Sequence, residues 1–211
     1  MEWEDMVRVH TPDQRGTAKI DRITITRDQV AFAALRGERL REGLYCRLLL
    51  DGDVMMSDTE NERLTNRQAV IGAHGDVLIA GLGIGMILIP MLQRPEVRSV
   101  TVLEKSADVI ALVEPAIREY TIYASKLAVI EADCFAWVMP KGLKWDWIYF
   151  DIWPDICTDN LPEIAQLKRK YSRRLNSESN PNARMFAWCE TKLRAKRRRE
   201  RHENLYAYRC G

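Results

Sequence analysis

Histidines, cysteine pairs and long apolar runs are scarce in this sequence, and their scarcity excludes several classes of protein. Three histidines occur in unrelated contexts: His10, His74 and His202. Five cysteines are scattered without any Cys-x-x-Cys pair: Cys46, Cys134, Cys157, Cys189 and Cys210. We therefore expect no metal cluster, no Ser-His-Asp hydrolase site and no disulfide framework. Scattered, unpaired cysteines also favour a reducing, cytoplasmic location.

Membrane-spanning runs and a strong net charge are also missing. The most apolar segment, Val77 to Leu92, contains three glycines and a proline and is shorter than the roughly 20 residues that a bilayer requires. The acidic first residues, Met1 to Asp5, lack the apolar core of a signal peptide. Lys and Arg total 32 against 30 Asp and Glu, so a globally basic nucleic-acid binder is not implied. We expect one soluble domain with a small appendage.

The N-terminal part has the pattern of a β-rich subregion. Ala18 to Thr26 and Tyr45 to Leu50 predict strands, and Asp51-Gly52 predicts a two-residue hairpin turn after the second. The segment between Asp28 and Arg41 fits either a short helix or another hairpin. A helix is then predicted over residues 60–73.

The start of that helix and an apolar pair on one face of it can also be read from the sequence. Ser57 and Glu60 have the spacing of a capping box. Leu64 and Ile71 lie two turns apart, on one face of the helix.

From Asp76 onward, strands and helices alternate. Short apolar segments predict buried parallel strands over residues 77–80, 97–103, 127–131 and 147–150. Further helices are predicted over residues 86–92, 106–120 and 161–175. This order predicts an α/β fold, a Rossmann-like and mostly parallel sheet flanked by helices.

The last part of the chain departs from this alternation. Residues 176–182 have the composition of a surface loop, and residues 185–201 predict a last helix. We therefore expect a shortened sheet, whose open edge is compatible with a homodimer. The chain divides into a β-rich subregion, a Rossmann-like core, and a loop with a basic helix: residues 1–58, 59–175 and 176–211.

A glycine-rich turn is the most specific motif. Gly81, Gly83 and Gly85 follow a buried strand and precede an apolar helix. Glycines let a ligand approach the backbone, and a helix N-terminus offers free N–H groups. The context predicts a nucleotide-type ligand site, the alternative being a tight turn without a ligand. A dinucleotide site is disfavoured because its fingerprint needs glycine where Met86 stands.

Acidic residues follow the next three strands, at the edge where open α/β sheets bind ligands. Glu104 can accept hydrogen bonds from both hydroxyls of a ribose, and Asp133 from an adenine amino group. Asp151 can act as a general base or hold a substrate amine, with Trp153 as a pocket wall. Each carboxylate could instead be a helix cap or a surface group.

In this order, the motifs between Asp76 and Asp155 resemble the class I S-adenosylmethionine-dependent methyltransferase superfamily, nearest to its spermidine-synthase-like branch. The resemblance implies an S-adenosylmethionine site made of Gly81, Gly83, Gly85, Glu104, Lys105, Asp133 and Cys134. It implies that Asp151 is catalytic and that Trp153 and Asp155 complete the substrate pocket. Leu48 to Glu62 resembles the hairpin and gate segment of aminopropyltransferases.

Departures from that branch bear on the transferred group. Met55-Met56 stands where the branch has Gln, and Leu64-Thr65 where it has Tyr-His. Pro154 replaces the second acid of the strand-four motif, and Asp155 is shifted by one position. We therefore expect a methyltransferase with an unidentified acceptor. The alternatives are aminopropyl transfer from decarboxylated S-adenosylmethionine, and a non-catalytic cofactor-binding scaffold that acts through the basic C-terminal helix.

The basic run itself has two interpretations. Seven Lys or Arg occur among residues 192–201. They can bind nucleic acid or form a solvated helix end. The near-neutral net charge and the lack of interleaved aromatic residues favour the solvated helix end.

Overall fold

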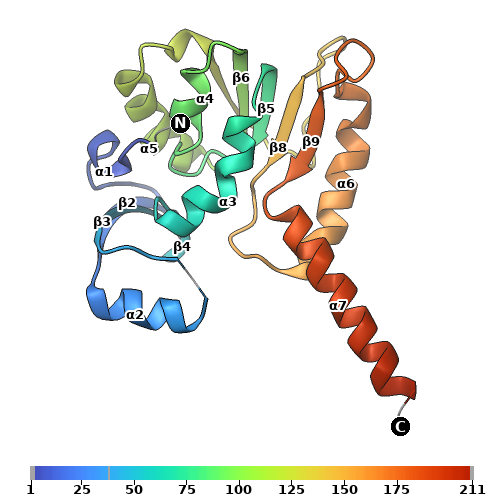
Figure 1. The fold of residues 1–211 in the computed structure, drawn as a ribbon. Coiled ribbons are helices and arrows are strands. Elements are labelled where there is room, and N and C mark those ends of the chain that lie inside the picture. Colours follow the sequence, from blue (N-terminus) through green and yellow to red (C-terminus); the bar gives the residue numbers. More distant parts are fainter. Residues whose placement is uncertain (1–2, 38, 210–211) are drawn as a thin grey trace.

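Two sheets organise the chain (Figure 1). The computed structural model describes residues 3–37 and 39–209, with side chains described as far as His202, so Cys210 lies outside the described residues. The larger sheet has five parallel strands in the order β7-β6-β5-β8-β9. This order, with helices on both faces, confirms the predicted Rossmann-like α/β class.

The strands of the larger sheet match the apolar segments of the sequence. They are β5 (Gly75–Ala80), β6 (Val97–Glu104), β7 (Leu127–Glu131), β8 (Trp147–Phe150) and β9 (Arg184–Ala187). One face packs against α3 (Glu60–Ile71), α4 (Leu88–Leu92) and α5 (Ala107–Tyr120). The other packs against α6 (Leu161–Tyr171) and the start of α7 (Glu190–Arg209). β5 and β8 are buried on both faces, as their unbroken apolar runs predict.

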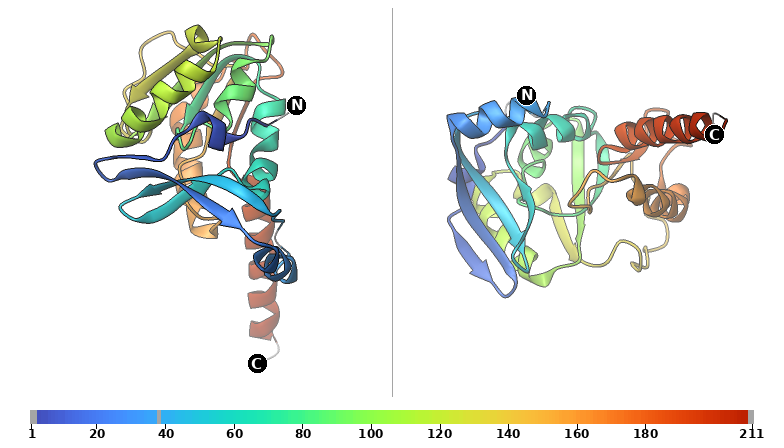
Figure 2. Two further views of the ribbon diagram at one scale, coloured as in Figure 1. Left: turned by 90° about the vertical axis from the view of Figure 1, so that its left-hand side faces the viewer. Right: turned by 90° about the horizontal axis from the view of Figure 1, so that it is seen from below.

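The smaller sheet is antiparallel and lies beside the first face (Figure 2). Its strands are β1 (Asp13–Arg15), β2 (Ala18–Ile25), β3 (Gly43–Leu50) and β4 (Asp53–Ser57). The helix α1 (Met6–Val9) precedes β1, and α2 (Arg27–Leu35) lies between β2 and β3 in the chain. Asp51 and Gly52 both have positive φ angles and join β3 to β4, as predicted. The helix α2 settles the alternative that the sequence left open over residues 28–41.

The start of α3 at Glu60 is confirmed, but its predicted Ser57 cap is wrong, and its apolar pair Leu64 and Ile71 does not mark a buried face. Thr59 is its N-cap, and Ser57 instead ends β4 and exchanges a hydrogen bond of 3.1 Å with the Thr59 hydroxyl. Leu64 and Ile71 are exposed, because α3 buries Asn66 and small residues against the sheet. Burial of Asn66 is tolerated since its Oδ1 accepts the Tyr149 O–H at 2.8 Å.

The predictions after the glycine turn and after residue 182 also need correction. The helix after the glycines is short, since α4 begins only at Leu88. The sequence predicted helix from Met185, but residues 184–187 form β9, paired in parallel with β8. Pairing satisfies backbone groups of β8 that would otherwise be buried without partners. The sheet then stops at five strands, shortened as expected.

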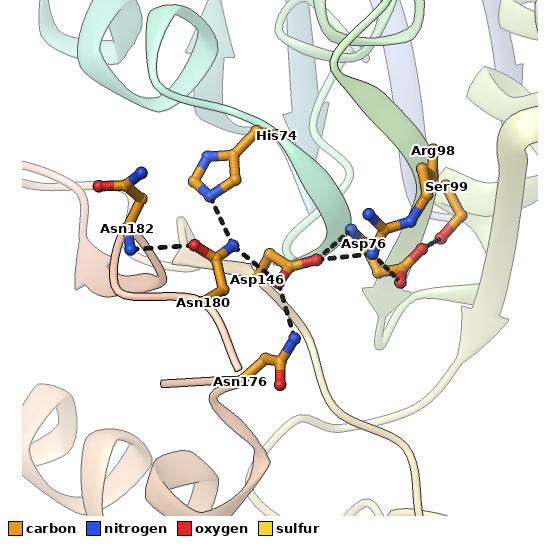
Figure 3. A network of polar contacts seen from close by, with 8 residues as sticks. All are labelled: His74, Asp76, Arg98, Ser99, Asp146, Asn176, Asn180 and Asn182. Carbon is orange, nitrogen blue, oxygen red and sulfur yellow. Dashed lines mark hydrogen bonds and ion pairs between the residues drawn. The ribbon is translucent and has the colours of Figure 1, made fainter. Parts of the chain in front are cut away.

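A polar network closes the amino-terminal end of this sheet (Figure 3). The buried Asp146 accepts hydrogen bonds from Asn176 and Asn180 at 2.9 Å and pairs with Arg98 at 2.8 Å. Burial alone would raise the pKa of Asp146, but these groups and the Asp76 N–H outweigh it and lower that pKa to about 2. The network thereby fastens loop 176–182 to β5 and β6. In the described part of the chain, no helix is long and apolar enough to cross a membrane.

Candidate functional site

A cavity of about 260 Å³ lies at the carboxyl ends of β5, β6 and β8. This is slightly smaller than the roughly 300–1,000 Å³ of typical small-molecule pockets. Eight of the predicted site residues line it: Gly81, Gly83, Glu104, Lys105, Asp133, Cys134, Asp151 and Trp153. Gly85 and the exposed Asp155 are not among the lining residues. The parallel sheet thus brings most of the predicted residues together.

The three glycines of the turn have different structural roles. Gly81 has a φ angle of +100°, and a Cβ there would lie 2.0 Å from the Asp151 carbonyl oxygen, so glycine lets β5 and β8 pass closely. A Cβ on Gly83 would lie 2.0 Å from the Met56 sulfur. Gly85 is buried against Ile117 of α5 and serves packing. Only Gly81 and Gly83 face the cavity.

Met56 covers the glycine turn from the smaller sheet. Its sulfur accepts the Ile84 N–H at 3.2 Å. The pairing of β3 with β4 shifts register between Leu48 and Leu49, which leaves Met55 as an extra residue on β4. Such a bulge can re-aim successive side chains, and here both Met55 and Met56 line the cavity. The sequence marked the two methionines only as a departure from the branch it resembles.

Glu104 is fixed in orientation by the backbone around it. Its Oε2 accepts the Leu82 N–H at 2.9 Å, and its Oε1 accepts the Ser106 N–H at 2.8 Å. A carboxylate has about four acceptor sites, so each oxygen keeps room for a further donor. The side chain is therefore preorganised to receive a pair of hydroxyl groups.

Asp133 and Cys134 form another wall of the cavity. Asp133 Oδ1 accepts the Phe135 N–H at 2.7 Å, so this carboxylate caps a turn as well as lining the cavity. Burial raises the pKa of the Cys134 thiol to about 12. That thiol is neutral near pH 7 and offers an apolar contact rather than a nucleophile.

Two carboxyl groups with raised pKa values face the same cavity. Burial, and then the negative charge of Glu62, raise the pKa of Asp151 to about 8. Burial raises the pKa of Glu62 to about 7. Both side chains line the cavity, Glu62 from the first turn of α3 and Asp151 from the end of β8. Near neutral pH such a pair can bind a cation or take up a proton.

Glu62 was not selected from the sequence. It lies inside the segment that resembles a gate, but α3 offers several acidic and polar residues with equal claims. Trp188 was also missed. Its indole lines the cavity and donates to the Thr65 hydroxyl at 3.0 Å. Trp153 donates its indole N–H to Glu163 at 2.7 Å, which fixes that wall.

No group of three or more His, Cys, Asp or Glu side chains is arranged for a metal ion among the residues that the structure describes.

Comparisons with known proteins give a curated relative of low coverage. No protein-family model matches the chain. Polyamine aminopropyltransferase 1 of Streptomyces coelicolor is 30% identical over 134 residues, which are 60% of this chain and 24% of that protein. The chain thus spans about a quarter of the length of the curated relative that it matches.

Two solved structures are similar at low identity. The precorrin 8W decarboxylase of Methanobacterium thermoautotrophicum has a TM-score of 0.43 and 17% identity, over 64% of this chain and 67% of that one. The glycopeptide N-methyltransferase MtfA has a TM-score of 0.41 and 18% identity, over 54% of this chain and 51% of that one. Likeness at these scores does not identify an activity, and the fold class rests on the strand order given above.

Proposed function

We propose that this protein is an S-adenosylmethionine-dependent transferase that places a methyl group on the nitrogen of a cationic amine. The observation that carries the proposal is the pair of Glu62 and Asp151 in the cavity that also holds the glycine turn and Glu104. The groups that would bind the nucleoside and the groups that would bind the amine therefore line the same cavity.

The residues present fit the cofactor. Gly81 and Gly83 keep the turn free of Cβ atoms, and the space above Gly83 is filled only by the far end of the flexible Met56 side chain. Glu104 is held ready for the two ribose hydroxyls. Asp133 lies on the wall where an adenine amino group would donate. The bound cofactor supplies a methyl group activated by its sulfonium charge.

The carboxyl pair supports catalysis through proton handling. An alkyl ammonium group cannot attack carbon, because its nitrogen lone pair is bound to a proton. With a pKa of about 8, Asp151 accepts that proton in its ionised form, whose share rises as pH approaches and passes 8. Removal of the proton frees the lone pair that the nitrogen would need to take up the methyl group. Glu62, when ionised, pairs with the ammonium group before its proton is removed, and this contact helps align the nitrogen.

Aminopropyl transfer is the second candidate. The likeness to a polyamine aminopropyltransferase supports it. The charge of the cavity supports it too, because the lining contains four carboxylates and Lys105 as its one basic side chain. A cofactor without a carboxylate, such as decarboxylated S-adenosylmethionine, avoids repulsion by those of the four groups that are ionised, and Glu62 and Asp151 join them as pH rises through about 7 and 8.

Parallel calorimetric titrations with S-adenosylmethionine, S-adenosylhomocysteine and decarboxylated S-adenosylmethionine test the proposal. We expect the first two to bind. Incubation with mono-, di- and polyamines then identifies the transferred group, by a mass gain of one methyl or one aminopropyl group. Preference for the decarboxylated form would replace the methyl proposal with the aminopropyl one. Failure of all three to bind would overturn both and favour a scaffold without turnover.

A further inference from the structure

The helix α7 extends away from the body of the protein in every view (Figures 1 and 2). Its first turn is anchored. Leu193 is buried against α6, and the Glu190 carboxylate pairs with Lys168 at 3.0 Å and with Arg194 at 2.8 Å. Beyond Ala195, every described side chain to His202 is exposed except the half-buried Glu200. The basic part of α7 therefore projects into solvent.

The basic side chains of α7 lie on two opposite faces. At about 100° of rotation per residue, Lys192, Lys196 and Arg199 fall within about 60° of one another. By the same count, a second group centres about 180° away from the first. Its members are Arg194, Arg197, Arg198 and Arg201. Seven basic residues are opposed by a single acid, Glu200, within residues 192–202.

We propose that α7 binds duplex DNA by lying in the major groove, with its two basic faces directed at the two flanking phosphate backbones. The major groove of B-form DNA accepts an α-helix and places phosphates on both sides of it. Arginine, the commoner basic residue here, makes bidentate contacts with phosphate. This inference is independent of the proposed transferase activity.

The two-sided charge argues against other anionic partners. A membrane surface engages one basic face and needs an apolar face opposite it, whereas the face opposite Lys192, Lys196 and Arg199 carries the four arginines of the second group. A flat acidic protein surface likewise uses one face. Duplex RNA has a deep, narrow major groove that side chains do not enter readily. The near-neutral net charge favoured a solvated helix end in the sequence, but the structure concentrates these basic charges in one projecting helix, where the charge of the whole chain matters less than the local charge.

Fluorescence anisotropy with the full chain and a labelled DNA duplex of about two helical turns tests the inference. Arg194 is partly neutralised by Glu190, which leaves six basic residues for phosphates. The logarithm of affinity should fall with the logarithm of salt concentration with a slope of about −5. The protein should bind single-stranded DNA of equal length more weakly than it binds the duplex.

Two triple variants each remove the charge of one face, and a third triple variant is the control. We expect Lys192→Gln with Lys196→Gln and Arg199→Gln to reduce the salt slope by about half. Arg197→Gln with Arg198→Gln and Arg201→Gln should do the same. The control removes three exposed charges elsewhere, at Arg15, Arg67 and Lys141, and should leave the slope unchanged.

Several outcomes would overturn the inference. These are no duplex binding at low salt, an equal loss in the control, sensitivity to one face alone, and tighter binding to phosphatidylserine vesicles than to DNA. Circular dichroism of each variant checks that helix content is unchanged. Glutamine keeps most of the helix propensity of Lys and Arg, so the variants test charge rather than folding.

Discussion

The carboxyl groups of Glu62 and Asp151 line one cavity, and the charge of Glu62 contributes to the raised pKa of Asp151. The two residues come from different layers, the first turn of α3 and the carboxyl end of β8. Burial raises the pKa values of the Tyr149 phenol and the Cys189 thiol, and the negative charges of Asp151 and Glu62 raise them further. Both groups are therefore neutral near pH 7. The pair of Glu62 and Asp151 is therefore the titrating unit of the site near neutral pH.

Removing the charge of Glu62 should shift the pH dependence of turnover. With Asp151 as the base, the rate rises as pH passes through the pKa of that residue, about 8. Glu62→Gln removes a negative neighbour, so the pKa of Asp151 falls and the rise moves to lower pH. Glu60→Gln, in the same first turn but outside the cavity lining, is the control. Rate profiles with unchanged midpoints in both variants would contradict the assignment.

Replacing Asp151 by Asn should stabilise the protein at high pH. A carboxyl group whose folded pKa is raised contributes stability that is present below the unfolded pKa and is lost as pH rises through about 8. Asn carries no such charge. Urea unfolding at pH 5 and pH 9 should therefore favour Asp151→Asn, relative to wild type, more strongly at the higher pH. The same difference at both pH values would show that Asp151 is solvated. Turnover of this variant should fall by about 10² to 10⁴.

Glu104→Ala should weaken nucleoside binding by about 10- to 100-fold, the usual effect of losing hydrogen bonds to a charged group. Glu131→Ala is the matched control, because Glu131 is the partner of Glu104 in the register of β6 and β7 but does not line the cavity. Calorimetry with S-adenosylhomocysteine measures both. Equal affinities in the two variants would show that Glu104 does not bind the ligand.

The polar network beneath the sheet should be sensitive to loss of the Asp146 charge. The pKa of Asp146 is lowered to about 2 in the folded protein. The stabilisation by this carboxylate is therefore present above its unfolded pKa of about 3.9, and it is lost as pH falls through about 2. Asp146→Asn should cost about 2 kcal/mol of unfolding free energy at pH 7. Urea unfolding at pH 7 and pH 3 measures this, with a smaller difference expected at pH 3.

Gly75 should tolerate no side chain, because a Cβ there would collide with Asp146. Gly142, which has a similar backbone conformation but open space around it, is the control. The φ angle of Gly75 is +62°, and a Cβ there would lie 2.0 Å from Asp146 Oδ2. Gly142 has a φ angle of +82° with open space around it. Gly142→Ala therefore carries only backbone strain, of about 1 kcal/mol, and Gly75→Ala adds displacement of Asp146. Thermal unfolding should show a clearly larger loss for Gly75→Ala, and equal losses would contradict the described network.

Much of the core could be predicted from local sequence pattern. Residues 127–131 and 147–150 form strands with the predicted bounds, because an apolar run between turn residues records burial directly. Once these strands are parallel, the residues that follow them must meet at one edge. For this reason Glu104, Asp133 and Asp151 line the same cavity as Gly81 and Gly83.

The pattern failed where the decisive contact comes from another element. The sequence predicts helix from Met185, but pairing with the edge of β8 makes residues 184–187 a strand. Leu64 and Ile71 have the spacing of a buried face, but small residues and a hydrogen-bonded Asn66 let α3 pack more closely. Local periodicity carries no information about such partners.

The sequence by itself determined the α/β class and the side chains at the carboxyl edge of the sheet, because both follow from local periodicity and strand direction. The tertiary structure alone decided that Glu62 faces Asp151, that Met56 covers Gly83 and that α7 stands free of the body. Each of these depends on how separate layers pack. Packing is set by the shapes of surfaces distant in the chain, which the order of residues within any one element does not record.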